Sequence, residues 1–458
     1  MFRIHFPVVL SRFSLMKPFL QFIFLSLTLM IFCFGANAQL RSHQFLSSEE
    51  AQEDFQILWT TLKEVHPDLY RLNSKIKMDS LAEEMNQDLA KSSSVGYLEL
   101  LSKIAELTTA VGDIHLQWSH SRDYIKFRNQ NIPVIPLVFE YWDGSFLLKD
   151  DFGQNLQLQL GTKIIAINGE KMDDYLIKNY PLLPIQGENH NIQAEWLANY
   201  YPNHHTNFWE QPVFYILESQ YQNEAIRTDT IWARTKGEFL TSRQEESTNT
   251  SPYQFKIEGQ KAFLKIEYFK KKYFNEEHPG MDLAEFGSYL DSVFQIIHQE
   301  KIELLELDIQ GFNVGDHRYG QLLFAHLVDQ PFQYVEEVKL PQFDQLSEEK
   351  YVQVLKTTPD SILKSLSAEH PPAIYPFSGQ LDVHANGISF SAKSLFCSNL
   401  VKRAQTTFRK ACGAAYYGIN CGELAVNLPH SGIKVYIPTK QLICNPEFYS
   451  KTEGILYR

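Results

Sequence analysis

Between residues 262 and 401, short apolar runs alternate with segments whose apolar residues recur every three or four positions. We expect strands at Ala262–Tyr268, Glu303–Ile309 and Leu381–Ala385, and helices around 286–297, at Arg318–Val328 and at Ser391–Val401. Further strands are expected near Leu424–Leu428 and Ile433–Ile437, whereas 329–380 reads as loop-rich. Strands that alternate with helices favour a sheet covered by helices. The sequence therefore predicts an α/β domain in this half of the chain.

The residues from 47 to 109 have a helical pattern. Ser47 and Glu50 have the spacing of a capping box, and the first helix is expected to stop before Pro67. A second helix is expected over Met78–Leu89, and a third ends at Gly112. The next six residues, Asp113–Trp118, alternate like a strand. This pattern places His115 just past a helix–strand junction.

Short strands and turns begin at about Ile132. We expect strands at Pro133–Phe139 and Phe146–Leu148, and the run Gly161–Gly169 joins an apolar strand to an Asn-Gly hairpin turn. Thr241–Pro252 has almost no apolar residues and is interpreted as a linker or exposed loop. The chain thus divides into a helical, a β-rich and an α/β part.

The first 38 residues have the features of a secretory signal peptide. Three basic residues precede an apolar run from Phe19 to Phe34, and Ala36-Asn37-Ala38 offers a cleavage site before Gln39. The apolar run is shorter than the roughly 20 residues that a membrane-spanning helix needs, so an uncleaved anchor is the less favoured alternative. We expect a secreted or periplasmic protein without a membrane span after signal removal.

Composition argues against nucleic acid as a partner. The 458 residues contain 42 Lys and Arg against 54 Asp and Glu, a formal charge of −12, and no block of basic residues. Binding to DNA or RNA needs clustered positive charge. At this length, two to four globular domains are expected.

Metal-binding patterns are also missing from the sequence. His204 and His205 are adjacent rather than four residues apart, so they cannot share one helix-borne site, and we expect them in a loop. Four cysteines follow the signal segment, without a spacing that suggests zinc: Cys397, Cys412, Cys421 and Cys444. Their pairing is left open, and neither a metal nor another cofactor is predicted.

Two serines follow an apolar strand and open an apolar helix. Ser389 and Ser391 therefore lie where backbone N–H groups and the positive end of a helix dipole can stabilise an oxyanion. The same position is the commonest place for a serine that caps a helix. The local pattern is compatible with both roles.

An ordered set of motifs resembles the tail-specific (C-terminal-processing) serine peptidase family, in particular its exported bacterial branch. The motifs are Asp113-Ile-His115, Gly161–Gly169, Leu307-Asp-Ile-Gln-Gly311, Gly387-Ile-Ser-Phe-Ser-Ala392 and Leu428–Val435. Each motif is weak alone, and the likeness, which covers about residues 48–440, rests on their order.

The resemblance implies an α/β (α+β) multi-domain protein. The implied parts are an N-terminal helical region that contributes His115 (39–128), a PDZ-like module (129–240) and an α/β peptidase core of the crotonase/ClpP-like kind (253–458). The signal peptide (1–38) and the linker (241–252) complete the division of the chain. It also implies Ser391 as nucleophile and His115 as general base. A serine–lysine dyad does not fit, because Tyr416 occupies the place where the lysine is expected.

Several positions depart from the family pattern. Where the family commonly has Asp-Leu-Arg-Gly-Asn-Gly-Gly-Gly, this chain has Gln310 for the arginine, and Asn313 and Val314 for two glycines. The backbone candidates for the oxyanion site are accordingly Gly311, Gly315 and Ala392. The acid expected to orient the histidine is absent from residues 409–414.

The sequence therefore predicts an exported serine endopeptidase that cleaves peptides or proteins through an acyl-enzyme. Its partner would be a peptide or protein substrate, bound by strand addition and with its C-terminus as one possible recognition element. The alternative is a catalytically weak or inactive relative that acts as a peptide-binding envelope protein.

Overall fold

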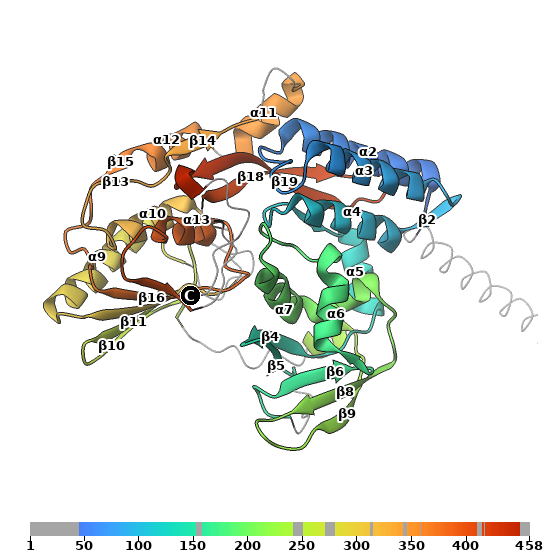
Figure 1. The fold of residues 1–458 in the computed structure, drawn as a ribbon, viewed down its shortest axis with the longest axis horizontal. Coiled ribbons are helices and arrows are strands. Elements are labelled where there is room, and N and C mark those ends of the chain that lie inside the picture. The colour runs from blue at the N-terminus through green and yellow to red at the C-terminus, as the bar shows by residue number, and fades with distance from the viewer. Residues whose placement is uncertain are drawn as a thin grey trace, which may run out of the picture.

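The computed structural model describes residues 45–152, 158–240, 251–270, 280–311, 315–341, 346–357, 359–409, 415 and 417–448. The predicted signal peptide and positions 241–250 of the predicted linker lie outside these ranges. Figure 1 shows helices of the N-terminal part above a β-rich module, with a mixed helix-and-sheet core beside both. None of the helices in the described ranges has the length and apolar content needed to cross a bilayer.

The N-terminal part consists of helices α2 (Ser48–Val65), α3 (Lys75–Leu89) and α4 (Tyr97–Val111), with β1 (Phe45–Ser47) paired to β2 (Ser94–Gly96). The capping box is confirmed, because the Ser47 hydroxyl accepts from the Glu50 N–H while the Glu50 carboxylate accepts from the Ser47 N–H. Gly112 ends α4 with a φ of 75°. A Cβ at Gly112 would lie 2.4 Å from the Leu72 side chain, so the chain turns here only with glycine.

The strand expected over Asp113–Trp118 is wrong for its first four residues. Strand β3 covers only Gln117–Ser119, and helix α5 (Arg122–Asn131) follows it. Residues 113–116 form a turn in which the Leu116 N–H donates to the Asp113 carbonyl (3.1 Å) and the His115 N–H donates to the Asp113 carboxylate (2.9 Å). An aspartate that bonds to the backbone two residues on favours a turn over a strand. His115 thus projects from a turn.

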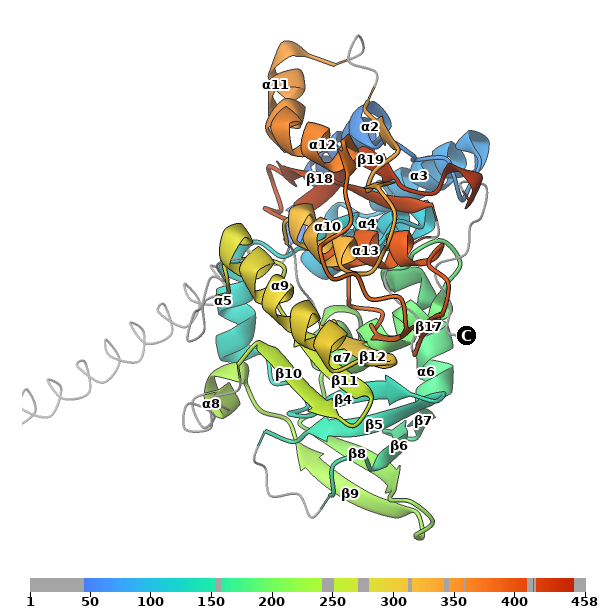
Figure 2. The ribbon, with the colours of Figure 1, turned by 90° about the vertical axis from the view of Figure 1, so that its left-hand side faces the viewer.

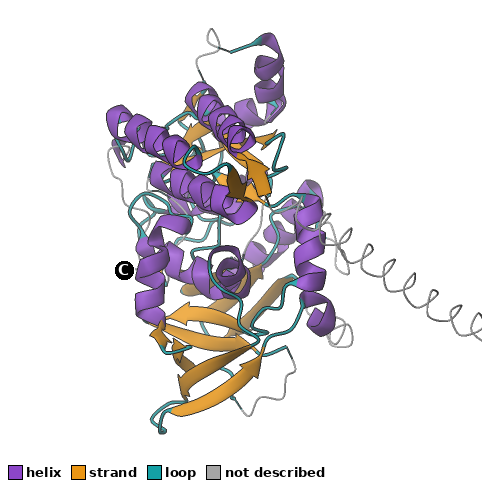
Figure 3. Cartoon of the chain, turned by 90° about the vertical axis from the view of Figure 1, so that its right-hand side faces the viewer, coloured by secondary structure: helices purple, strands orange, loops and turns teal. Residues whose placement is uncertain are grey.

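The β-rich module contains an antiparallel sheet in the order β4-β5-β6-β8-β9, with β7 paired to β6. Its strands are β4 (Val138–Trp142), β5 (Ser145–Asp150), β6 (Lys163–Ile167), β7 (Glu170–Lys171), β8 (Phe214–Gln220) and β9 (Arg227–Trp232). The predicted hairpin turn is confirmed, since Asn168 and Gly169 have φ values of 53° and 78°. Figure 3 shows this sheet at one end of the molecule.

Helices connect the strands of the module: α6 (Met172–Asn179), η1 (Tyr180–Leu182), α7 (His190–Phe208) and, after β9, α8 (Lys236–Leu240). The loop expected at His204 and His205 is wrong, because both residues lie in α7. His204 bonds to the Asn179 side chain (2.7 Å) and His205 to the Tyr175 hydroxyl (3.0 Å). The helix packs an apolar stripe of Ala194, Leu197, Ala198 and Tyr201 into the core of the module. Pro202 and the buried polar residues of the same helix mask this stripe in the sequence.

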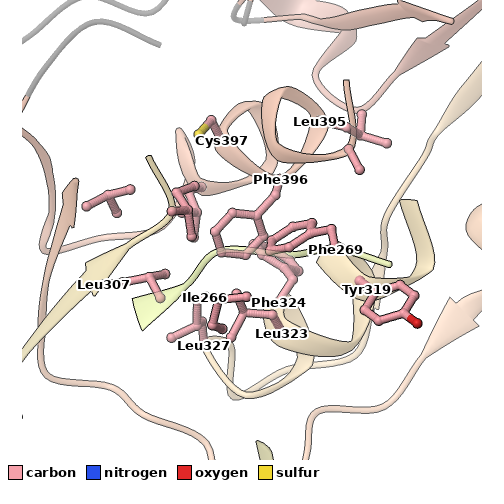
Figure 4. Close-up of a cluster of buried hydrophobic side chains, with 14 of the residues drawn as sticks. Ile266, Phe269, Leu307, Tyr319, Leu323, Phe324, Leu327, Leu395, Phe396 and Cys397 are labelled. Carbon is pink, nitrogen blue, oxygen red and sulfur yellow. The ribbon is translucent and has the colours of Figure 1, made fainter. Parts of the chain in front are cut away.

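The α/β core confirms the predicted fold class. Its sheet has the order β10-β11-β12-β16-β17, with β10 antiparallel and the other pairs parallel. The strands are β10 (Tyr253–Glu258), β11 (Lys261–Ile266), β12 (Leu304–Asp308), β16 (Gln380–His384) and β17 (Thr406–Phe408). Helices α9 (Leu283–Gln299), α10 (His317–Ala325) and α13 (Ala392–Leu400) pack on this sheet, and Phe269, Phe324 and Phe396 meet between them (Figure 4).

The interval that the sequence analysis leaves as loop-rich contains short elements: β13 (Phe332–Gln333), β14 (Glu337–Lys339), α11 (Glu348–Thr357), α12 (Asp360–Ser367) and β15 (Glu369–His370).

A C-terminal hairpin joins the core to the N-terminal helices. Its strands, β18 (Gly418–Asn427) and β19 (Lys434–Ile443), are longer than expected, and η4 (Pro446–Phe448) follows. β19 pairs with β18 on one edge and with both β3 and β14 on the other. Side chains of the hairpin share a hydrophobic cluster with α2, α3 and α4, and the two strands run between these helices and the core in Figures 1 and 2. Because β3 directly follows the His115 turn, this pairing holds that turn against the core.

Candidate active site

Ser391 lies at the junction between the loop after β16 and helix α13. Its φ of 63° and ψ of −118° lie outside the regions that residues with a side chain normally adopt. An ordinary N-cap has an extended backbone, and its side chain accepts a helix N–H. Ser391 has neither feature. A strained serine on a sharp strand-to-helix turn is the geometry of a nucleophile, and such strain costs about 1–3 kcal/mol.

Ser389 has a different environment. Its hydroxyl donates toward the Ile309 carbonyl (3.2 Å) and the Asn386 side-chain oxygen (2.7 Å), and accepts from the Asn386 N–H (3.1 Å). These contacts hold the 386–391 loop against the end of β12. Ser389 therefore has the bonding of a structural residue, whereas no hydrogen bond of the Ser391 hydroxyl is found within the described residues.

His115 lies beside Ser391 although the two are 276 positions apart in the chain. The Ser391 N–H donates to His115 Nε2 at 3.3 Å, and the His115 ring packs against Phe390 with a centroid separation of 5.2 Å. Both residues are buried, with exposed fractions of 1% for His115 and 3% for Ser391. The Nε2 lone pair therefore points at the serine residue, toward its amide rather than its hydroxyl.

Asp113 supplies an acid on the other side of the imidazole. Its carboxylate lies 3.2 Å from His115 Nδ1. Because Nε2 accepts a hydrogen bond, Nδ1 carries the proton and donates it to Asp113. This tautomer leaves Nε2 able to take a proton, as the base of a serine–histidine–acid site must. The family pattern predicts this acid downstream of Ser391, whereas in the structure Asp113 takes the place beside the imidazole.

Two further side chains hold the Asp113 carboxylate in place. His66 Nε2 (3.1 Å) and the Asn420 side-chain amide (2.8 Å) donate to its second oxygen. His66 Nδ1 accepts from the Asp68 N–H, which fixes His66 as a donor to Asp113. Burial by itself would raise the pKa of Asp113, but the hydrogen bonds from His115 and His66 outweigh it and hold the pKa well below its usual value. Asp113 is thus a buried, ionised carboxylate.

The three backbone candidates for an oxyanion site have distinct surroundings. Ala392 is the first residue of α13, where helix N–H groups have no partner within the helix. The Gly311 N–H, at a φ of 102°, donates to the Asn386 side-chain oxygen (3.3 Å). Gly315 packs against Phe269, since a Cβ there would lie 2.6 Å from the Phe269 carbonyl oxygen. Of the three, only Ala392 directly follows the serine.

Helix α7 of the β-rich module reaches the same loop. The Gly387 N–H donates to the Glu195 carboxylate at 2.6 Å, and a Cβ at Gly387 would lie 2.9 Å from Ile192 Cα. The loop that carries Ser391 is therefore packed directly against the module, and only glycine allows this approach.

Several sequence departures fall outside the described residues: Phe312, Asn313, Val314, 410–414 and Tyr416. Gln310 is described, and its N–H donates to the Asp308 carboxylate (3.0 Å). Cys397, Cys421 and Cys444 are buried and form no disulfide among the described residues, while Cys412 lies outside the described ranges. Within those ranges, no group of three or more His, Cys, Asp or Glu side chains is arranged to hold a metal ion.

No protein-family model and no curated protein matches the sequence. Solved structures of CPAF match this chain and cover 90% of its length. A serine-to-alanine variant of CPAF has a TM-score of 0.62 at 13% identity, and mature CPAF complexed with lactacystin has 0.60 at 13%. Mature CPAF has 0.58 at 14%, and the three matches cover 92–93% of the CPAF chain. CPAF is a member of the tail-specific protease family. The predicted likeness to that family is thus confirmed for the fold.

Proposed function

We propose that this protein is an exported serine endopeptidase, with Ser391 as nucleophile, His115 as general base and Asp113 as the acid that orients the histidine. One observation carries the proposal. The backbone of Ser391 is strained at the N-terminus of α13, and its amide nitrogen lies 3.3 Å from His115 Nε2. The other ring nitrogen of His115 lies beside the buried Asp113 carboxylate. Chance burial of polar residues does not account for a strained backbone and an ordered imidazole at the same place.

In the proposed reaction, His115 Nε2 takes the Ser391 hydroxyl proton as the oxygen attacks the scissile carbonyl carbon. The imidazolium returns that proton to the leaving amine, which leaves an acyl-enzyme. Water then attacks the ester carbonyl, again through His115, and releases the acid product. Rotation of the Ser391 side chain toward Nε2 precedes the first step, because its amide holds that nitrogen in the resting geometry.

The oxyanion formed in each step would accept a hydrogen bond from the Ala392 N–H, which lies at the positive end of the α13 dipole. Gly311 would contribute its N–H only if Asn386 released it, since the two are hydrogen-bonded. Gly315 would act by allowing the chain to pass close to Phe269.

Substrate peptides would bind as an added strand on the 129–240 module, which we propose to be PDZ-like, and reach Ser391 across α7. The proposed location is the periplasm or the exterior, on the strength of the signal-like residues 1–38. Neither a metal nor another cofactor takes part in the proposed reaction.

Labelling with a fluorophosphonate probe tests the proposal. We expect the wild-type protein to be labelled, Ser391→Ala to be unlabelled, and the matched variant Ser389→Ala to keep labelling because its hydroxyl serves the loop. Equal background labelling of wild type and Ser391→Ala would contradict catalysis.

A second candidate function is a non-catalytic peptide-binding envelope protein of the same fold. Two observations favour it: the Ser391 side chain is 3% exposed, and His115 Nε2 bonds to the amide. The same labelling experiment separates the two, because a binding protein would bind peptides without reacting with the probe.

A further inference from the structure

A polar pocket of about 490 Å³ lies beside the loop that carries Ser391. Its lining residues come from four places in the chain: β5, the end of β11, the end of β12 and the segment around the serine. They are Lys149, Lys265, Glu267, Tyr268, Asp308, Gln310, Gly311, Asn386, Ile388 and Lys393. The pocket therefore lies at the carboxyl ends of parallel strands, which is where open α/β sheets bind ligands.

Residues on both sides of Ser391 in the chain line the pocket. Ile388 precedes Ser391 by three residues, and Lys393 follows it by two, so both walls continue directly into the nucleophile turn. A substrate held at Ser391 would place a residue near the scissile bond, or its own end, into this space.

Three lysines and two acids line the pocket, and the acids have partners within it. The Asp308 carboxylate accepts the Gln310 N–H (3.0 Å), and Glu267 lies 3.7 Å from the Lys265 ammonium group. The Lys149 ammonium group, by contrast, is exposed and has no ion pair or hydrogen bond within the described residues. One positive charge at the rim is thus left for a ligand.

Lys393 lies in the wall of the pocket, where the Asp308 and Glu267 carboxylates act on its charge. Its side chain is fully buried, and its ammonium group donates to the neutral carbonyl groups of Gln310 (3.1 Å) and Gly311 (3.4 Å). Burial lowers the pKa of Lys393 to about 8, so the group is still mostly protonated near pH 7. Its hydrogen-bond partners are neutral, and the three lysines outnumber the two carboxylates by one, so the pocket as a whole favours one added anion.

We propose that this pocket binds a carboxylate of the peptide substrate, either an Asp or Glu side chain near the scissile bond or the free C-terminus. The inference rests on the proposed function to the extent that the ligand is a peptide. A basic side chain would meet Lys149, Lys265 and Lys393 and is disfavoured. The carboxylate would also link the β-rich module, which provides Lys149, to the core, which provides the other two lysines.

Peptide binding to the Ser391→Ala protein tests the pocket without requiring catalysis. The probes are three series of fluorescein-labelled nonapeptides, in which a single Glu, Gln or Lys is placed at each position in turn. Every peptide is made once with a free and once with an amidated C-terminus. Fluorescence anisotropy should give about tenfold tighter binding for Glu than for Gln at one position, or for the free over the amidated C-terminus, the scale of one charge-assisted contact. The two arms distinguish a side-chain from a terminal carboxylate.

Adding Lys149→Glu to this background should abolish the acidic preference and leave binding of the Gln and amidated peptides within about twofold. Lys163→Glu is the matched control, because Lys163 is an exposed lysine of the neighbouring strand β6 and does not line the pocket. It should keep the preference. Both changes are at exposed positions, and circular dichroism verifies that both variants are folded.

Equal binding of the Glu and Gln series with no effect of the free C-terminus, a preference for Lys, or no measurable binding would each overturn the proposal. Failure of the peptidase function gives a different result: acid-selective binding persists while the wild type is not labelled by the fluorophosphonate. Labelling without acid selectivity would retain the peptidase and reject the pocket.

Discussion

The turn that carries His115 and the turn that carries Ser391 meet at the candidate site, but the hydrogen bonding of their polar side chains differs. In the first, the Asp113 carboxylate accepts four N–H groups, from the amide and ring of His115, from His66 and from Asn420. In the second, Ser389 and Gly387 are bonded, while Ser391 has a strained backbone and no described partner for its hydroxyl. A base must keep one orientation, whereas a nucleophile must be available to react.

The largest expected effect is at the unbonded serine. Ser391→Ala should lower kcat by about 10⁵–10⁶-fold, the scale found when a peptidase loses its nucleophile. Steady-state hydrolysis of a fluorogenic peptide measures it, with Ser389→Ala as control. A residual rate above about 1% of wild type would show that the contrast between the two serines has no catalytic meaning.

The next largest effect is expected in the bonded turn. Asp113→Asn should lower kcat by about 10⁴-fold. The asparagine amide group does not hold the His115 proton on Nδ1 as the carboxylate does, so it favours the tautomer in which Nε2 carries the proton and cannot act as the base. The pH dependence of kcat separates this role from simple structural support: an enzyme that lacks the orienting acid regains activity as pH rises, whereas a misfolded one does not. Unchanged kcat would remove Asp113 from the site.

The contact between the serine loop and helix α7 should have a smaller effect. Gly387→Ala forces a methyl group to within 2.9 Å of Ile192 Cα, so the loop must move away from Glu195. A displacement of about 1 Å at a reacting group costs roughly 100-fold in rate. Comparison of kcat with KM tests this, since a shifted nucleophile lowers kcat more than it alters KM. Gly287→Ala serves as a control for an added methyl group, because its φ, like that of Gly387, is not positive and the nearest atom to a Cβ there is 3.9 Å away.

Acid should destabilise the His115 turn through Asp113. The pKa of this carboxylate lies well below its usual value, so its stabilising contribution is complete above the unfolded-state pKa of about 4 and falls as pH drops below it. Urea unfolding between pH 6 and pH 3 should therefore show a steeper loss of stability for wild type than for Asp113→Asn. One proton contributes a slope of at most about 1.4 kcal/mol per pH unit. Parallel curves would mean that Asp113 is not held ionised by folding.

The smallest expected effect is the release of strain at Ser391. Glycine adopts its φ of 63° without steric conflict, so Ser391→Gly should be about 1 kcal/mol more stable than Ser391→Ala. Thermal or urea unfolding of the two inactive variants measures the difference. Greater stability of the alanine variant would show that the turn is not strained.

Much of the fold could be predicted from the sequence because its signals are local. The capping box at Ser47, the Asn168-Gly169 turn and the alternation of strands and helices in the core depend on residues a few positions apart. Helix α7 is harder to recognise in this way, because Pro202 and buried polar residues mask the apolar residues that it packs into the module. The partners of its two histidines, Asn179 and Tyr175, are found only in the tertiary structure.

The candidate site was only partly predictable. Ser391 and His115 were selected from motifs that resemble a family, and the structure brings them together. Asp113 could have been found from its position two residues before His115, because that spacing is typical of an aspartate bonding to its own turn. Asn420 gave no such signal, since 307 positions separate it from the carboxylate that it contacts.

The sequence by itself determined the elements with strong local signals, such as the first helices, the Asn168-Gly169 turn and the strands and helices of the core, and it offered side chains that are chemically suited to act as nucleophile and base. Only the tertiary structure decided which serine is strained, which acid faces the histidine, and that α7 and the β18–β19 hairpin bring these turns together. The reason is physical: periodicity and turn chemistry act over a few residues, whereas backbone strain and the hydrogen-bond partners of a buried group depend on segments hundreds of residues apart packing in one place.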